Sequence, residues 1–175
     1  MATGKKINPN EIKMLVLDVD GVLTSGGLVF NADGSESKIF NTLDGHGLRL
    51  WKRAGLKTAF LSGRTSLPTA MRAKQLEIDY CMQECLDKVK SLDELLTKAG
   101  LSQGNIAYIG DDLPDLPVIK RAGFGVAVAN AVDIVKQYAD YVTIRSGGEG
   151  AVREVIEYIL KSTGKWPELL KKYME

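Results

Sequence analysis

Two aspartates, Asp18 and Asp20, are separated by one residue and directly follow the apolar run Met14–Leu17. An unbroken apolar run is typical of a strand that is buried on both faces of a parallel sheet. Open parallel sheets bind ligands just beyond the carboxyl ends of their strands, so both carboxylates are predicted to lie at a ligand site. Two like charges at about 4 Å and an effective dielectric constant near 20 repel by roughly 4 kcal/mol. A bound cation or different protonation states would relieve this repulsion; the alternative is a pair of solvated loop carboxylates.

Polar residues also follow the other predicted strands. They are Ser62, Gly63 and Arg64 after one strand, Lys88 at the start of a helix, and Asp111, Asp112 and Asp115 after another strand. In a parallel sheet, all of these positions lie at one edge. Taken singly, Ser62 could cap a helix, Lys88 could be solvated, and the acids could begin a helix, where the helix dipole favours them. Because that interpretation needs several coincidences at one edge, we favour a joint site.

This set of side chains suits phosphoryl transfer. Mg²⁺ in proteins takes one or two carboxylates together with waters and phosphate oxygens, so Asp18 and Asp111 could share one ion. The ion would shield the approach of a carboxylate nucleophile to an anionic phosphate. Ser62 and Lys88 would hold phosphate oxygens. Asp20 would then protonate the leaving alkoxide and later activate water.

The bulk properties predict a cytoplasmic globular protein. The chain has 175 residues, 45% of them hydrophobic and 26% charged, with a net charge of +1, which gives no sign of a nucleic-acid-binding surface or of disorder. It has no apolar stretch of membrane-spanning length, and its start, Met-Ala-Thr-Gly-Lys-Lys, lacks the apolar core of a signal peptide. Cys81 and Cys85 match neither redox nor zinc spacings, and we expect buried or inert thiols.

Apolar runs alternate with amphipathic segments, which predicts a doubly wound, mainly parallel α/β sheet. Strands are expected near 14–17, 58–61, 80, 106–109, 125–128 and 141–142, and helices near 45–54, 66–77, 87–99, 115–121, 131–137 and 149–161. Residues 26–40 interrupt this alternation. Asp33-Gly34 predicts a hairpin there, with Leu28–Phe30 and Ile39-Phe40 as its apolar strands.

The motifs, in this order, resemble the haloacid dehalogenase superfamily of phosphohydrolases. They are Asp-Val-Asp-Gly-Val-Leu-Thr at 18–24, Leu-Ser-Gly-Arg at 61–64, Lys88, and Gly-Asp-Asp-Leu-Pro-Asp at 110–115. The hairpin and the segments 40–49 and 147–154 resemble more narrowly the capless branch that contains the 3-deoxy-D-manno-octulosonate 8-phosphate phosphatases. The resemblance implies a single Rossmann-like domain over 1–175, Mg²⁺-dependent phosphatase activity through an aspartyl-phosphate, and a place in lipopolysaccharide biosynthesis.

The resemblance also implies a role for each residue. Asp18 would be the nucleophile and Asp20 the general acid and base, while Ser62 and Lys88 would bind the phosphoryl group. Mg²⁺ would be held by Asp18, the main-chain carbonyl of Asp20, and Asp111.

Contacts to a sugar-acid substrate are implied as well. The matching positions are Asp20, Asn41, Asp44, Gly45, Arg49, Gly63, Arg64, Arg72 and Lys88. Arginine pairs bidentately with carboxylate or phosphate, although Arg49 and Arg72 could instead lie on a solvated helix face. The branch often has an arginine where this chain has Leu43, which leaves the exact substrate open. Arg64 favours the octulosonate over a nine-carbon nononate or sialic acid type substrate, because phosphatases for nononates tend to carry an acidic residue there.

Phosphate monoesters need rate accelerations of up to about 10²¹ and benefit from sites that exclude water. Because the chain has no inserted cap, we expect, as in the branch, a homotetramer in which the hairpins of neighbouring subunits close each site. The apolar hairpin strands would otherwise be exposed edges. The tail from about 163 to 175, with Trp166 and Tyr173, has few places to bury its aromatics and could also reach a neighbour. His46, the only histidine, is expected in a turn or an interface.

Other functions remain open at this point. A phosphotransferase or mutase of the same superfamily would share these motifs. A receiver-type signalling domain would carry a single aspartate after a later strand, without the Asp-x-Asp start. A noncatalytic phosphate-binding or regulatory domain is disfavoured because all four motifs are intact.

Overall fold

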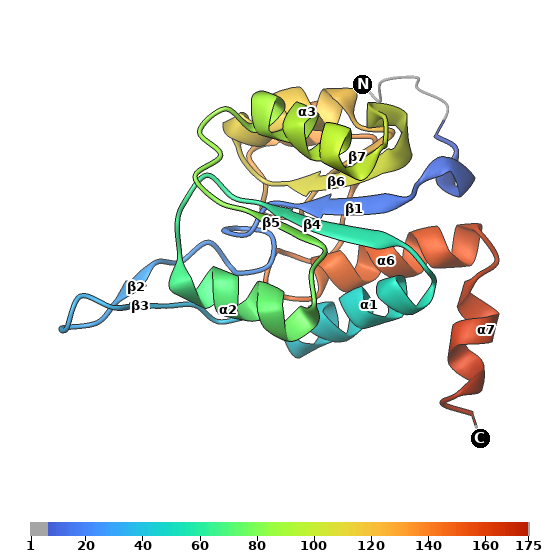
Figure 1. Cartoon of the computed structure of the whole chain (residues 1–175), viewed down its shortest axis with the longest axis horizontal. Helices are drawn as coiled ribbons and strands as arrows, with labels where there is room; N and C mark the ends of the chain where they lie inside the picture. The colour runs from blue at the N-terminus through green and yellow to red at the C-terminus, as the bar shows by residue number, and fades with distance from the viewer. Residues whose placement is uncertain (1–6, 175) are drawn as a thin grey trace.

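A six-stranded parallel sheet forms the centre of the computed structural model, which describes residues 7–174 (Figure 1). Residues 1–6, which include the Met-Ala-Thr-Gly-Lys-Lys start, and residue 175 lie outside the described residues. The strand order is β5–β4–β1–β6–β7–β8. These strands are β1 (Met14–Leu17), β4 (Lys57–Leu61), β5 (Tyr80–Met82), β6 (Ile106–Gly110), β7 (Phe124–Ala127) and β8 (Tyr141–Val142). The predicted doubly wound parallel sheet is therefore confirmed.

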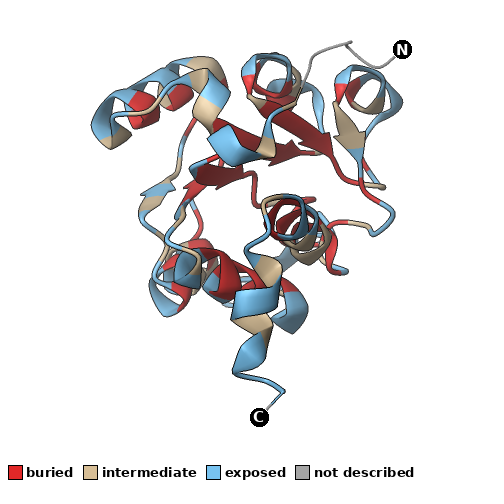
Figure 2. Cartoon of the chain, turned by 90° about the vertical axis from the view of Figure 1, so that its right-hand side faces the viewer, coloured by how far each residue is buried: buried red, intermediate tan, exposed pale blue. Residues whose placement is uncertain are grey.

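Helices cover both faces of this sheet (Figures 1 and 2). One face carries α3 (Lys88–Ala99), α4 (Leu116–Arg121) and α5 (Asp133–Tyr138), and the other carries α1 (Thr42–Arg53), α2 (Leu67–Leu76) and α6 (Ala151–Ser162). Short 3₁₀ turns occur at Pro9–Glu11, Gln103–Asn105 and Leu113–Asp115. Within residues 7–174, no helix has the length and apolar character needed to cross a bilayer.

The central strand β1 aligns the residues that follow its neighbours. All four of its side chains are buried, as expected for a strand with helices on both faces. Leu17 is in register with Phe60 of β4 and with Ile109 of β6. The chain therefore leaves these three adjacent strands at the same edge, which confirms the predicted convergence of their carboxyl ends.

The hairpin between β1 and α1 is present, but its second strand differs from the prediction. It pairs β2 (Val29–Phe30) with β3 (Glu36–Ser37) in antiparallel fashion and projects from the sheet (Figure 1). The turn closes through a backbone hydrogen bond from Asn31 N–H to the Ser35 carbonyl, which places Glu36 and Ser37 opposite β2. Ile39-Phe40, predicted as the strand, lies beyond this short ladder.

An additional helix, α7 (Trp166–Lys171), follows α6 and was not predicted. The expectation that the tail aromatics lack places to pack is wrong for Trp166. Its ring lies under two cations of α6, 5.6 Å from the Arg153 guanidinium carbon and 5.2 Å from Lys161 Nζ. These two cation–π contacts hold the start of α7 against α6.

Tyr173, which follows α7, forms a hydrogen bond with His46 of α1. Nε2 of His46 lies 2.9 Å from the Tyr173 hydroxyl, which also accepts a 2.5 Å hydrogen bond from Arg53. His46 lies inside α1 rather than in a turn. The predicted turn position is therefore wrong, and the alternative, a position in an interface, stays a prediction.

The cysteines are unpaired, and only Cys85 is buried, whereas Cys81 is exposed. Loss of solvation raises the pKa of both thiols, and for Cys85 this effect outweighs the hydrogen bond from Ser91 and the charge of Lys88, which act to lower its pKa. A raised thiol pKa lowers the fraction of reactive thiolate at neutral pH.

Candidate active site

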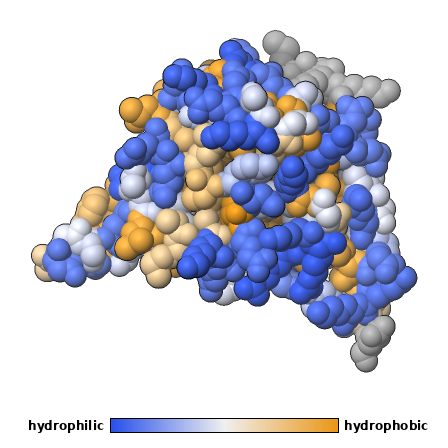
Figure 3. Space-filling model, viewed as in Figure 1, coloured by the Kyte–Doolittle hydropathy of each residue, from blue (hydrophilic) through white to orange (hydrophobic). Residues whose placement is uncertain are grey.

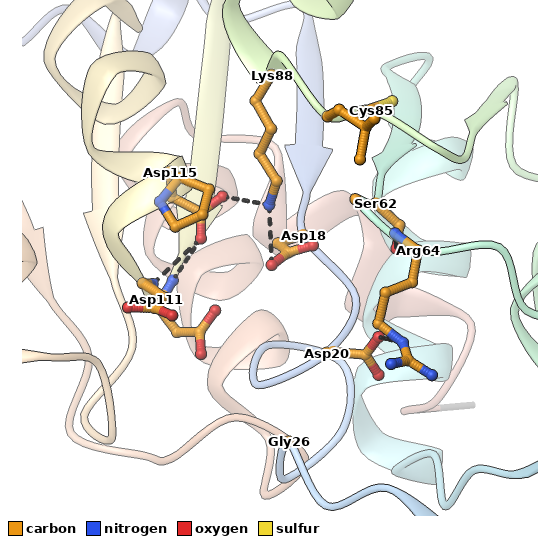
Figure 4. Close-up of a pocket in the computed structure, with 13 residues that line it drawn as sticks. Asp18, Asp20, Gly26, Ser62, Arg64, Cys85, Lys88, Asp111 and Asp115 are labelled. Carbon is orange, nitrogen blue, oxygen red and sulfur yellow. Dashed lines mark hydrogen bonds and ion pairs between the residues drawn. The ribbon is translucent and has the colours of Figure 1, made fainter.

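A pocket of about 400 Å³ opens at the carboxyl ends of β1, β4 and β6 (Figure 4). The predicted site residues that line it are Asp18, Asp20, Ser62, Gly63, Arg64, Lys88 and Asp111. Residues separated by up to about half of the chain thus meet in one cavity, as the strand order requires.

Lys88 connects two carboxylates in the floor of this pocket. Its Nζ lies 3.0 Å from Oδ2 of Asp18 and 2.6 Å from Oδ1 of Asp115. Burial acts to lower the Lys88 pKa, but the charges of the two carboxylates outweigh this effect and the pKa is raised. The ammonium therefore stays charged beside Asp18.

Asp115 is a site residue for which the sequence predicted no role. It is fully buried, and its Oδ1 accepts hydrogen bonds from Lys88 and, at 2.5 Å, from the Tyr108 hydroxyl. Its Oδ2 accepts from the backbone N–H groups of Asp111 (3.0 Å) and Asp112 (3.2 Å). Asp115 thereby fixes both Lys88 and the loop after β6. The available signals were its place among the polar residues after this strand and in the motif at 110–115.

Three carboxylates gather beside Lys88. Oxygens of Asp18, Asp111 and Asp115 lie within 4.8 Å of one another. Burial, followed by the Asp115 charge, raises the pKa of Asp18 to about 6. Burial, followed by the Asp18 charge, raises the pKa of Asp111 to about 7. The site therefore holds more negative charge than Lys88 alone compensates.

Asp111 shows that this set of donors fits a divalent cation. Its Oδ1 is buried and has no hydrogen-bond partner among the residues described. Gly21, at φ +88°, makes room for this carboxylate, since a Cβ there would lie 2.0 Å from Asp111 Oδ2. A free buried carboxylate oxygen beside a second carboxylate is the hard-oxygen environment that Mg²⁺ prefers. Each oxygen of Asp115 already accepts two hydrogen bonds, whereas each oxygen of Asp18 has one such partner and Asp111 Oδ1 has none among the described residues, so Asp18 and Asp111 are the available carboxylate ligands.

We expect Mg²⁺ to stabilise the fold more at about pH 8 than at about pH 5.5. The folded-state pKa values of Asp18 and Asp111 lie above their unfolded values, so their protonation favours the metal-free fold at low pH. This contribution is lost as pH rises through about 6 to 7. Over the same range the carboxylates become free to bind the ion. Thermal melts with and without Mg²⁺ measure the effect, at about 2–4 °C per kcal/mol for a chain of this size.

Asp111→Asn is the matched variant for these melts. It removes one ionised ligand with little change in side-chain volume, so both the Mg²⁺ shift and its pH dependence should diminish. If Mg²⁺ raised the Tm of the unaltered protein equally at the two pH values, the result would contradict the charge balance described for the pocket.

Asp20 faces the other side of the pocket from Asp111 (Figure 4). Its Oδ1 forms an ion pair with Nζ of Lys38, and its Oδ2 lies 3.6 Å from Nε of Arg64. Lys38 was not predicted as a site residue, because the hairpin sequence gave no indication that its single lysine turns inward. Ser62 is buried, and its Oγ accepts a hydrogen bond of 3.3 Å from the Arg64 N–H.

Five of the predicted substrate-contacting residues do not line this pocket. They are Asn41, Asp44, Gly45, Arg49 and Arg72. Asn41 caps α1 and donates a hydrogen bond of 3.0 Å to the Gly148 carbonyl, and Asp44 accepts one of 2.8 Å from the Arg153 N–H at the start of α6. Arg72 donates to the Asn41 carbonyl, and Arg49 is exposed. In the single chain Asn41, Asp44 and Arg72 thus connect the start of α1 to α2 and to the start of α6, and the contact of all five residues with substrate stays a prediction.

Comparisons with known proteins show the family of this chain. The family model for haloacid dehalogenase-like hydrolases matches residues 69–156, and the chain belongs to this family. The 3-deoxy-D-manno-octulosonate 8-phosphate phosphatase KdsC of Escherichia coli is 40% identical over 157 residues, which span 90% of this chain and 84% of that protein.

Solved structures show the same relationship. The 3-deoxy-D-manno-octulosonate 8-phosphate phosphatase of Moraxella catarrhalis, in complex with magnesium ion, phosphate ion and KDO, is 40% identical with a TM-score of 0.92, over 94% of this chain and 95% of that one. A protein described as a probable YrbI family phosphatase from Pseudomonas syringae pv. phaseolica 1448a is 48% identical with a TM-score of 0.93, over 95% of each chain.

Proposed function

We propose that this protein is a Mg²⁺-dependent phosphomonoesterase that converts 3-deoxy-D-manno-octulosonate 8-phosphate into the free sugar acid and phosphate. One observation carries the proposal: at the sheet edge, the Asp18 carboxylate lies beside the buried Lys88 ammonium and close to Asp111, whose Oδ1 has no hydrogen-bond partner among the described residues. Identity of 40% to phosphatases of this name, over most of both chains, supports the choice of substrate.

In this mechanism, Asp18 attacks the phosphorus atom, and a bond from its carboxylate oxygen to phosphorus replaces the bond to the sugar oxygen. Asp20 gives a proton to the departing alkoxide. Asp20 then takes a proton from water, whose oxygen attacks the aspartyl-phosphate and releases phosphate and the Asp18 carboxylate. Ser62 and Lys88 hold the phosphoryl oxygens throughout.

Asp18, Asp111 and the main-chain carbonyl of Asp20 would hold Mg²⁺, which neutralises charge between nucleophile and phosphate when it is bound. Hydrogen bonding fixes the orientation of the nucleophile before substrate arrives. Oδ1 of Asp18 accepts a 2.7 Å hydrogen bond from the Val19 N–H, and Oδ2 faces Lys88. A carboxylate held on both oxygens loses little further freedom when it attacks.

Arg64 is the pocket residue best suited to the carboxylate of the sugar acid. Its side chain is 41% exposed, and Nη2 is held 2.9 Å from Oε1 of Glu36. A guanidinium at the mouth of a pocket can pair bidentately with a carboxylate while the phosphate occupies the floor. A nine-carbon keto sugar acid 9-phosphate is the alternative substrate.

The test is a Mg²⁺-dependent phosphate-release screen across sugar-acid phosphates, with wild type and Arg64→Ala compared on each compound. We expect the eight-carbon keto acid phosphate to give the highest kcat/KM. Arg64→Ala should raise KM for that substrate by about 10-fold or more, since a charged hydrogen bond contributes roughly 1.5–3 kcal/mol. A neutral ester, p-nitrophenyl phosphate, should show a smaller rise.

The neutral ester is also the control for the contact of Arg64 with Asp20. A rise in KM that is common to both substrates reports on the contact of Arg64 with Asp20. Only the difference between the two rises reports on carboxylate binding. Equal rises in KM would remove the case for carboxylate recognition by Arg64, and preference for a nine-carbon substrate would favour the alternative.

We further propose a cytoplasmic homotetramer of single-domain subunits, in which the hairpin of each subunit covers a neighbour's pocket. The hairpin supports this proposal because Val29 and Phe30 are 47% and 65% exposed and Ile39, just beyond it, is 82% exposed. Figure 3 shows hydrophobic side chains along the projecting hairpin and at its base. Light scattering measures the assembly, and a fully active monomer would contradict it.

A further inference from the structure

Lys38 places a buried positive charge beside Asp20. It follows directly after β3, yet its side chain is only 1% exposed. Its Nζ forms an ion pair with Oδ1 of Asp20 and lies 3.3 Å from Oε1 of Glu36. A buried ammonium without a carboxylate partner would be strongly unfavourable, so the seating of the hairpin and the position of Asp20 depend on each other.

The two oxygens of Asp20 face different cations. Oδ1 faces Lys38, and Oδ2 faces Nε of Arg64 at 3.6 Å. Arg64 is 41% exposed and Lys38 is 1% exposed, so only Lys38 is held rigidly by its surroundings. Glu36 binds both cations and so completes a ring of alternating charges in which two of the four members come from the hairpin.

Asp20 is also subject to a competing attraction. It is two residues from Asp18, at the edge of a site whose donors fit a divalent cation. A carboxylate so close to such an ion would be drawn to it as a further ligand unless another positive charge held it elsewhere. A carboxylate bound to the ion could no longer carry a proton to the leaving group.

We propose that Lys38 is a positioning residue that holds the Asp20 carboxylate away from the metal site and on the leaving-group side of the pocket. This inference rests on the proposed function, in which Asp20 protonates the sugar alkoxide. It makes the acid step depend on the hairpin, because Lys38 and Glu36 can leave their positions beside Asp20 and Arg64 only if the hairpin moves. The hairpin therefore acts on chemistry in its own subunit.

The experiment compares Lys38→Met with wild type on two substrates whose leaving groups differ. Methionine keeps most of the apolar stem and removes the ammonium. A sugar alkoxide needs a proton in order to leave, whereas p-nitrophenolate leaves without one. We therefore expect kcat for the eight-carbon sugar-acid phosphate to fall by about 10²-fold or more, within the range of general acid catalysis, and kcat for p-nitrophenyl phosphate to fall by less than about 10-fold.

Two further variants separate positioning from a loss of structure. Lys38→Arg keeps a cation and should restore most of kcat on the sugar phosphate. Lys74→Met removes an exposed lysine of α2 that does not line the pocket, and it should leave both rates unchanged. Equal losses of kcat on the two substrates in Lys38→Met, or an effect on KM alone, would overturn the proposal.

A crystal structure of Mg²⁺-loaded Lys38→Met gives a second readout that needs no turnover. We expect the Asp20 carboxylate to rotate toward the ion, and an unchanged side-chain position would overturn the proposal. If wild type releases phosphate from no sugar-acid phosphate, the proposed function fails, and this structural readout still decides the role of Lys38. If wild type is active and Lys38→Met is indifferent to the leaving group, only the positioning role fails.

Discussion

Asp18→Asn should abolish Mg²⁺-dependent phosphate release, with a fall in kcat/KM of at least about 10⁴-fold, as expected when a covalent nucleophile is removed. The amide oxygen cannot form a stable ester with phosphorus. The amide has nearly the same shape as the carboxylate and can still accept the hydrogen bond from the Val19 N–H. Lys88 keeps its 2.6 Å contact with Asp115, so the fold should survive. Steady-state phosphate release and circular dichroism measure the two parts of this expectation.

Asp112→Asn is the matched control for this substitution. Asp112 also lines the pocket, but its side chain is exposed and its Oδ1 accepts a hydrogen bond from the Leu113 N–H, which an amide oxygen can also do. We expect Asp112→Asn to retain activity within a few-fold of wild type. Retained turnover in Asp18→Asn, under conditions in which the control is normal, would refute the assignment of the nucleophile.

Asp115→Ala should destabilise the protein by about 3 kcal/mol or more, because removing one partner of a buried ion pair leaves the other charge poorly compensated. Lys88 would lose one of two carboxylates, and the buried Tyr108 hydroxyl would lose its acceptor. The backbone N–H groups of Asp111 and Asp112 would lose theirs as well. For a chain of this size, such a loss lowers Tm by roughly 6–12 °C.

Activity should fall in the same variant, since both Lys88 and the loop that carries Asp111 lose their anchor. Asp115→Asn keeps an acceptor for the backbone N–H groups and should lie between Ala and wild type in Tm. Adding Tyr108→Phe to Asp115→Ala removes the unpaired hydroxyl. The loss of stability in the double variant should therefore be smaller than the sum of the losses in the two single variants. Additive losses, or a Tm for Asp115→Ala within about 2 °C of wild type, would contradict the network.

The elements that position the site were largely predictable because their signals are local. The apolar run Met14–Leu17 ends at Asp18, and the strand that ends before Asp111 shows the same pattern. Because these strands pair in parallel, the two carboxylates are predicted to lie together, and this prediction needs no knowledge of side-chain contacts. Local patterns also predicted the helices other than α7 to within a few residues, because Gly100 and similar turn residues mark helix ends.

The partners of these residues were not predictable in the same way. Asp115 and Lys38 are buried because segments distant in the sequence enclose them. The residues next to each of them in the sequence do not differ in composition from a solvated acidic or basic stretch. The second hairpin strand was misplaced because its register depends on the turn that closes at Asn31 and Ser35, whereas the apolar pair Ile39-Phe40 suggested a longer ladder. The direction in which a side chain points depends on tertiary packing, and sequence spacing alone does not determine it.

The position of β1 at the centre of the sheet has a consequence for how activity arises during synthesis. Met14 pairs with Lys57 on one side and with Ile106 on the other, so the first strand to leave the ribosome stays half-paired until most of the chain has been made. Such long-range pairing slows folding and leaves an apolar strand open to other chains meanwhile. Asp18 and Asp111 also meet only after this pairing. A chain that has been made only as far as a residue before Asp111 therefore lacks the assembled pocket.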